Sequence, residues 1–183
     1  MTRKKSLSCS VVGMTVMALP AVSANAAGFI EDSKASLELR NFYLNRDFRE
    51  NAGQNKREEW AQGFILNLES GYTQGTVGFG LDALGMLGVK LDSSPDRSGT
   101  ELLPVSASDK RAADEYSRLA PTAKLRFAQT TVKAGDVSIF LPFAFASPSR
   151  LLPQTFRGTT LSSKDIDGLT FNTGYIDRIN KRD

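Results

Sequence analysis

The sequence predicts an all-β protein, a transmembrane antiparallel up-and-down β-barrel, and three observations lead to this fold class. Long segments alternate apolar and polar side chains with a period of two. Short connections at one end of these segments alternate with long polar connections at the other end. A tryptophan and a tyrosine are spaced along one segment at a distance that suits the apolar layer of a membrane.

Residues 1–26 are predicted to be a secretory signal peptide. The cations Arg3–Lys5 precede an apolar stretch, Leu7–Leu19, and the small residues Ala24–Ala26 suit cleavage. The apolar stretch is too short, and too interrupted by polar residues, for a transmembrane helix. The three leader cations account for the whole difference between 23 Lys and Arg and 20 Asp and Glu. The rest of the chain is electrically balanced, which argues against a nucleic-acid partner.

Composition excludes most catalytic chemistry. The chain has no histidine, and its one cysteine, Cys9, lies in the predicted leader. Ser–His–Asp hydrolysis and histidine-liganded zinc are therefore excluded. An enzyme would have to use carboxylates, lysine, serine or tyrosine, and the sequence shows no clustered set of these. We expect no enzyme activity, no bound metal and no cofactor.

The first predicted strand, Ser36–Arg46, alternates imperfectly, whereas the second, Arg57–Tyr72, is regular. Trp60 and Tyr72 lie on its apolar face, separated by about 40 Å of extended chain. With a strand tilt near 45°, this length spans about 28 Å, close to the roughly 25 Å apolar band of a membrane barrel. Trp60 and Tyr72 are therefore predicted to belong to the two aromatic girdles.

The third predicted strand, Thr76–Leu91, has apolar residues at nearly all its odd positions. The remaining strands are predicted at Ser117–Ala128, where Pro121 weakens the prediction, Thr131–Leu141 and Ile166–Tyr175. The short turns are Gly71–Gly75 and Gln129–Thr130, and the long polar loops are Asp47–Lys56, Asp92–Glu115 and Pro142–Lys164. About six strands are expected in one domain.

A soluble alternative remains open at this stage. A periplasmic β-rich binding module would keep the same strands but bury the face that carries Trp60 and Tyr72. Dependence on detergent distinguishes that module from a membrane barrel.

Several motifs resemble one family of proteins. They are Gly28–Ser33, Leu39–Tyr43, Asn45–Asp47, Trp60–Phe64, Glu69–Gly80, Gly88–Asp92 and Ser149–Thr155. Through nearly the whole mature chain, the sequence resembles the OprD family of outer-membrane porins. The resemblance implies a monomeric barrel of about 18 strands in the outer membrane of a Gram-negative bacterium. It also implies uptake of small water-soluble carboxylates, among them basic amino acids in some members.

Porins of this family are more than twice as long, so residues 27–183 are expected to be the N-terminal part of a single barrel domain. Physics leads to the same expectation, because six strands leave two open edges whose backbone groups would face lipid. The last residues, Lys181–Asp183, also lack the aromatic terminal strand that outer-membrane proteins carry as an assembly signal. The expected partners are outer-membrane lipid, the barrel-assembly machinery and carboxylate solutes.

Basic side chains are predicted to line the lumen. The assigned strand registers place these residues there: Arg40, Arg46, Arg57, Lys90, Arg118, Lys124 and Arg126. The acidic residues on the same face are fewer, namely Glu38, Glu59, Glu69 and Asp82. An excess of fixed cations would attract a carboxylate, and arginine suits its geometry. The resembled family has a ladder of basic residues, and Arg46 and Arg57 match two of its positions. The alternative is that these charges only hydrate a wet wall.

The third long loop is too apolar to lie free in water. Phe143–Pro153 contains two phenylalanines and two leucines, and it includes the predicted constriction residues Ser149, Arg150, Leu151 and Pro153. Such a loop should fold against another part of the protein. Folding into the lumen, as in the resembled family, would narrow the pore. A hydrophobic plug beneath an extracellular cap is the alternative.

Overall fold

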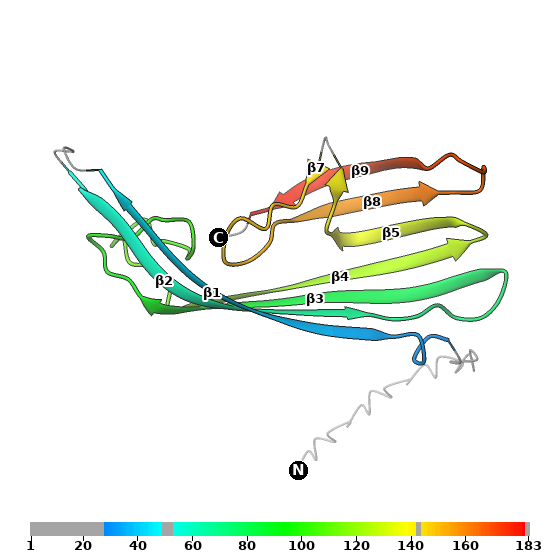
Figure 1. The fold of residues 1–183 in the computed structure, drawn as a ribbon, viewed down its shortest axis with the longest axis horizontal. Helices are drawn as coiled ribbons and strands as arrows, with labels where there is room; N and C mark the ends of the chain where they lie inside the picture. The colour runs from blue at the N-terminus through cyan, green and yellow to red at the C-terminus, as the bar shows by residue number, and fades with distance from the viewer. Residues whose placement is uncertain (1–27, 49–52, 142–143, 182–183) are drawn as a thin grey trace, which may run out of the picture.

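The computed structural model describes residues 28–48, 53–141 and 144–181, so the predicted leader lies outside the described residues. One seven-stranded antiparallel sheet has the order β1-β2-β3-β4-β5-β8-β9, and β6 and β7 form a separate hairpin. The sheet curls into a half-barrel with β1 and β9 at its edges (Figure 1). The strands are β1 (Lys34–Asp47), β2 (Lys56–Glu69), β3 (Val77–Asp92), β4 (Glu115–Phe127), β5 (Thr130–Val137), β6 (Phe140–Leu141), β7 (Ala144–Phe145), β8 (Thr155–Ser163) and β9 (Phe171–Asn180).

The two faces of the sheet differ in chemistry, because side chains alternate along each strand. The ladders pair Arg40 with Gly63, Gly63 with Gly88 and Gly88 with Tyr116, so these positions share one face. We call it the inner face, since the long loops fold onto it. The outer face carries exposed apolar side chains, among them Leu37, Leu39, Trp60, Phe64, Leu66, Phe79, Leu81, Leu119, Leu125 and Phe127. The predicted all-β fold with apolar-out alternation is confirmed.

The boundaries of β1, β3 and β4 agree with the prediction to within two residues, whereas β2 ends at Glu69 instead of Tyr72 and the later strands differ more. β5 ends at Val137, earlier than predicted, and β8 lies inside the segment predicted to be a loop. The last strand begins at Phe171 because residues 164–170 form a turn, in which the Leu169 amide donates to the Ile166 carbonyl and Gly168 has a positive φ. The main sheet therefore has one strand more than the six predicted.

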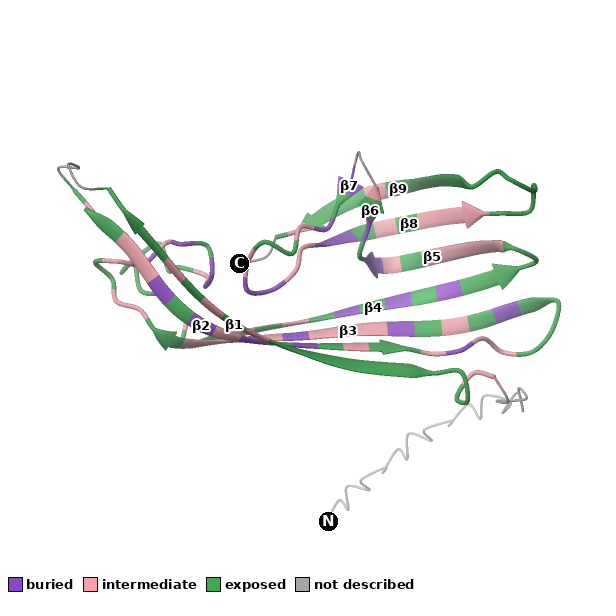
Figure 2. Ribbon diagram, viewed as in Figure 1, coloured by how far each residue is buried: buried purple, intermediate pink, exposed green. Residues whose placement is uncertain are grey.

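Buried apolar side chains lie in two clusters. The larger cluster joins inner-face residues of β2, β3 and β4 to two loops, and it includes Ala61, Ile65, Met86, Leu102, Leu103, Leu151 and Leu152. The smaller cluster surrounds the β6-β7 hairpin and contains Val137, Ile139, Ala144, Ala146 and Phe156. Figure 2 shows buried positions alternating with exposed ones along β3 and β4. Within the described ranges, no helix is long and apolar enough to cross a membrane.

Candidate functional site

Cations follow the inner face from the long-loop end to the short-turn end. Arg46 pairs with Arg57 in the ladder near the long loops. Further along the strands, Lys90 lies opposite Ala61, and Arg118 lies opposite Met86. Near the short turns, Lys124 lies opposite Gly80 on β3 and Lys133 on β5, and Arg126 lies opposite Gly78. The structure therefore brings the predicted lumen cations onto one face, as the register requires.

Two of these cations share one carboxylate. Asp82 Oδ1 lies 2.5 Å from Lys124 Nζ, and Asp82 Oδ2 lies 3.2 Å from Lys133 Nζ. Lys124 Nζ also donates to the Ser70 carbonyl at 2.6 Å. Lys133 was not among the predicted residues, although its register with Lys124 across the Gln129–Thr130 turn would have indicated it.

A cavity of about 460 Å³ separates part of the inner face from the β5–β8 loop, residues 138–154. Its polar lining mixes both signs of charge and consists of Glu38, Arg40, Glu69, Asp82, Lys133 and Asp136, with Ser36, Asn67, Thr122 and Ser138. Asp136 is itself bound by Arg157 Nη2 at 2.9 Å and by Asn180 Nδ2 at 2.8 Å. A small polar solute entering this cavity would meet cations and carboxylates together.

Arg40 attaches the β5–β8 loop to the inner face. Its Nη1 donates to the carbonyls of Pro148 at 3.1 Å and Arg150 at 2.8 Å, while Nη2 donates to Glu38 Oε1 at 2.7 Å. Five N–H donors in one planar group allow this simultaneous contact. Arg40 therefore contacts the loop directly, a role that its position on the strand did not predict.

Two glycines opposite each other in the β2–β3 ladder leave a trough without side chains on the inner face. A Cβ on Gly63 would lie 3.1 Å from the Leu151 carbonyl, and a Cβ on Gly88 would lie 2.3 Å from the Tyr116 ring. Leu151 is fully buried there. The absence of side chains at these positions lets a loop and an aromatic ring lie directly on the sheet.

The predicted constriction residues lie where the loop meets the sheet. Leu151 is buried, Pro153 lines the cavity, and Ser149 is exposed. Arg150 Nη2 lies 3.3 Å from Glu101 Oε2. The apolar loop thus folds against the inner face, in agreement with the expectation that it could not lie free in water.

Glu101 belongs to the β3–β4 loop, residues 93–114, which also folds inward. Leu102 and Leu103 are fully buried in the same cluster as Leu151. The Tyr116 hydroxyl donates to the Leu102 carbonyl at 2.9 Å. This inward fold was not predicted, because the loop is mainly polar and its apolar run at Leu102 and Leu103 is short.

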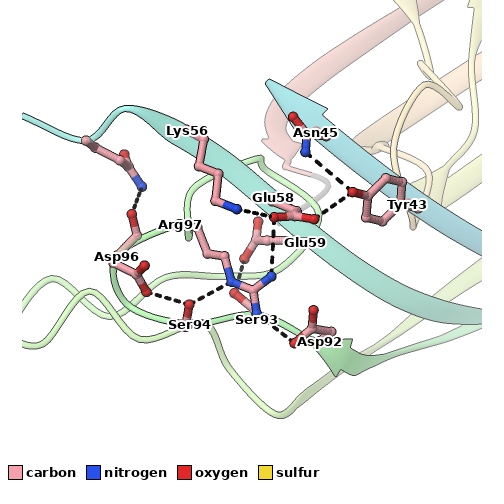
Figure 3. A network of polar contacts seen from close by, with 11 residues as sticks. Tyr43, Asn45, Lys56, Glu58, Glu59, Asp92, Ser93, Ser94, Asp96 and Arg97 are labelled. Carbon is pink, nitrogen blue, oxygen red and sulfur yellow. Dashed lines mark hydrogen bonds and ion pairs between the residues drawn. The ribbon is translucent and has the colours of Figure 1, made fainter. Parts of the chain in front are cut away.

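A polar network lies at the long-loop end of β2 (Figure 3). Glu58 accepts hydrogen bonds from the Tyr43 hydroxyl at 2.6 Å and from Lys56 Nζ at 2.9 Å, and it forms an ion pair with Arg97. Arg97 also donates to Asp92, and this hydrogen bond raises the pKa of the guanidinium above its ordinary value. The network attaches the β3–β4 loop to the rim of the sheet.

The two predicted ladder positions differ in their contacts. Arg57 donates to the Gly99 carbonyl at 3.1 Å and to Gln54 Oε1 at 3.1 Å, and its guanidinium lies 5.6 Å from the centre of the Phe48 ring. Arg46 is exposed next to it across the ladder. Both therefore lie at the long-loop end of the inner face.

The two predicted girdle residues do not lie together on the outer face. Trp60 lies on the outer face, 43% exposed, and its indole N–H donates to Asn41. Tyr72 lies beyond the end of β2, where its ring contacts two inner-face cations, with Arg126 4.3 Å and Lys124 4.9 Å from the ring centre. The predicted strand Arg57–Tyr72 therefore ends at Glu69, and the Trp60–Tyr72 spacing does not measure one strand.

Lys90 and Arg118 contact segments beyond the sheet. Arg118 donates to the Lys181 carbonyl, and Lys90 donates to Asp114 and to the Ala112 carbonyl. The hydrogen bond from Lys90 lowers the pKa of Asp114 below its ordinary value of 3.8. Asp114 therefore keeps its charge in moderately acidic solution.

We expect Asp114 to make the ion selectivity of the complete barrel depend on pH. A carboxyl whose pKa is lowered by folding stabilises its contact above the unfolded pKa, and this stabilisation is lost as pH falls through the folded pKa. In a complete barrel, Asp114→Asn should increase anion over cation permeability about twofold at neutral pH, because the Lys90 charge is no longer compensated. Reversal potentials in a salt gradient measure this. On acidification below pH 3.8, the ratio of anion to cation permeability should rise less in the variant than in the wild type. An equal rise in both would show that Asp114 is not the titrating group.

The site can bind and orient charged solutes, and its residues suit no evident covalent chemistry. In the described part of the chain, no three His, Cys, Asp or Glu side chains are grouped so that they could hold a metal ion. The inner face presents a series of fixed charges, some of which line a water-accessible cavity.

Comparisons with known proteins agree with this arrangement. A family described as outer membrane porin, OprD family, matches residues 27–183. The porin-like protein GalP of Pseudomonas putida is 46% identical over 155 residues, which cover 85% of this chain and 38% of GalP. The crystal structure of OccK9 (OpdG) from Pseudomonas aeruginosa is 53% identical with a TM-score of 0.82, covering 85% of this chain and 40% of OccK9.

A structure of Pseudomonas aeruginosa OpdK with vanillate is 48% identical with a TM-score of 0.77, covering 85% of this chain and 39% of OpdK. The chain therefore spans about two fifths of the length of these relatives. The family match, residues 27–183, includes all the described residues, and with them the inner-face cations and both inward loops. The chain belongs to the OprD family of outer-membrane porins, which are channels of the Gram-negative outer membrane rather than enzymes.

Proposed function

We propose that the complete protein takes up small water-soluble carboxylates, including basic amino acids, through a lumen lined by basic residues. The observation that carries the proposal is the series of inner-face cations from Arg46 and Arg57 at the long loops to Lys124 and Arg126 at the short turns. A carboxylate can pass between neighbouring cations without leaving their field.

The contacts of three of these cations support the proposal. Arg57 and Arg118 donate to neutral oxygen atoms, and Arg126 lies over an aromatic ring. Neutral partners hold a guanidinium in place without cancelling its charge. The vanillate in the OpdK structure is itself a carboxylate, which fits the same solute class.

The setting of the protein is part of the proposal. Residues 1–26 would be removed as an exported leader, and residues 27–183 would form the N-terminal part of one barrel domain. The exposed apolar outer face would contact membrane lipid, and the barrel-assembly machinery would insert the complete barrel. Mixed charge in the cavity suits a solute that carries an ammonium group as well as a carboxylate.

Arg46→Ala in the complete porin tests the solute class. We expect uptake of vanillate at low concentration to slow at least about threefold, because a charge-assisted hydrogen bond is lost from a partly hydrated passage. Uptake of glucose, a neutral solute of similar size, should change little. Liposome uptake measures both, and gel mobility before and after heating reports on barrel folding.

Lys164→Ala is the matched control, because it removes one positive charge from an exposed turn outside the strands. It should leave the uptake of both solutes unchanged. Equal slowing of vanillate and glucose by Arg46→Ala would contradict the proposed role of the cations.

A further inference from the structure

Glu59 is a carboxylate that does not itself line the proposed passage. It lies on the inner face of β2, yet its side chain has no exposed surface. Thr100 donates to Glu59 Oε2 through its amide at 2.8 Å and through its hydroxyl, and the Ser93 hydroxyl donates to Oε1 at 3.0 Å. A buried carboxylate is tolerated only where such donors replace water.

Both donors belong to the β3–β4 loop, so Glu59 attaches this loop to the sheet from beneath. Figure 3 shows the Glu59–Ser93 contact behind the more exposed contacts of Arg97. Thr100 is itself fully buried, and its hydroxyl accepts a hydrogen bond from the Leu102 amide at 3.3 Å. The fixed carboxylate therefore determines where the following residues of the loop lie.

Those following residues support the β5–β8 loop. Leu102 and Leu103 pack in one buried cluster with Leu151, and Glu101 forms an ion pair with Arg150 at 3.3 Å. The β5–β8 loop thus rests on the inner face through Arg40 and on the β3–β4 loop through these contacts. A change at Glu59 would reach the β5–β8 loop through the neighbouring loop.

We propose that Glu59 is a positioning residue for the constriction: it fixes the β3–β4 loop, which in turn holds the β5–β8 loop against the inner face and sets the width of the passage. The inference rests on the proposed function only in so far as the β5–β8 loop narrows a passage, and it does not depend on which solutes pass. Glu59 itself contacts no solute, because it is fully buried.

Single-channel recording of the complete porin with Glu59→Ala tests this. We expect open-channel current noise to rise severalfold and mean conductance to rise about 1.5-fold, because a loop that has lost its buried contacts samples more open positions. Thr100→Val removes one hydrogen-bond donor to Glu59 from the loop side of the contact. It should raise noise and conductance by less than Glu59→Ala does. Wild-type noise and conductance in Glu59→Ala would overturn the inference.

Glu31→Ala is the matched control. Glu31 is an exposed carboxylate in the turn that precedes β1, outside both inward loops and outside the 460 Å³ cavity. Its removal should leave the noise unchanged. Noise that rises equally in both variants would mean a general loosening of the barrel and would overturn the inference.

A crosslink separates positioning from general destabilisation. The sequence has no cysteine beyond Cys9, so Glu101→Cys and Arg150→Cys can be joined by a short bismaleimide in the Glu59→Ala background. The crosslink should restore wild-type conductance and noise, and failure to restore them would overturn the two-loop route. If Arg46→Ala slows vanillate and glucose equally while Glu59→Ala still raises noise, only the proposed solute class fails.

Discussion

Gly135→Ala is expected to prevent the normal pairing of β4 with β5 and to destabilise the barrel by at least about 3 kcal/mol. Gly135 has a φ of +135°, and a Cβ there would lie 2.3 Å from the Pro121 carbonyl oxygen and 3.0 Å from the Thr122 Cα. The obstacle is backbone, which cannot move aside as a side chain can. Urea unfolding of the complete porin in detergent, followed by gel mobility, measures the loss.

Gly53→Ala is the control for this substitution. A Cβ on Gly53 would meet nothing within 4 Å, and its φ is not in the positive region. This variant should stay within about 0.5 kcal/mol of the wild type. A Gly135→Ala barrel as stable as Gly53→Ala would show that the strand can relax around an added methyl group.

Arg40→Met is expected to release the β5–β8 loop from the inner face. The substitution keeps most of the apolar stem but removes the hydrogen bonds to the Pro148 and Arg150 carbonyls. Hydrogen bonds that involve a charged group are worth about 1.5–3 kcal/mol each. We expect conductance to rise at least about twofold and trypsin cleavage after Arg150 to accelerate about 100-fold, since local opening exposes that bond.

Arg126→Met is the matched control, because it also removes an inner-face guanidinium but one that lies over Tyr72 near the short turns. It should lower anion selectivity and leave cleavage after Arg150 at the wild-type rate. If both variants accelerated cleavage equally, Arg40 would be one general charge among several and the loop would have another attachment.

The strands that the sequence predicted most clearly are β2 and β3, in which one face is mainly apolar. β3 carries Val77, Phe79 and Leu81 at outward positions, and its period of two is evident in the sequence. β8 was missed because Phe156 and Leu161 fall on opposite faces and the other side chains are polar or glycine. A strand that lacks a regular apolar series is identified only by its neighbours in the sheet.

Some features of the candidate site could likewise be predicted from the sequence, and others could not. Strand parity was enough to place Arg40 and Lys124 on the inner face, and the apolar character of the β5–β8 loop was enough to predict that it folds against other residues. Parity could not show that Glu59 is buried beneath a second loop, because burial depends on contacts between residues far apart in the chain. The position of Tyr72 was missed for the related reason that the end of a strand depends on contacts with other segments, here the Gly71 amide with the Phe29 carbonyl.

The trough formed by Gly63 and Gly88 has a consequence for how the protein matures. It exists only after β2 and β3 have paired, and the hydrogen bond from Arg40 to the Arg150 carbonyl joins residues 110 apart in the sequence. Hairpins between successive strands form from local contacts, whereas distant contacts carry a larger entropic cost and form late. We therefore expect the β5–β8 loop to dock only after the strands have paired, so that maturation of a complete barrel would include an early state in which this inner face is still uncovered.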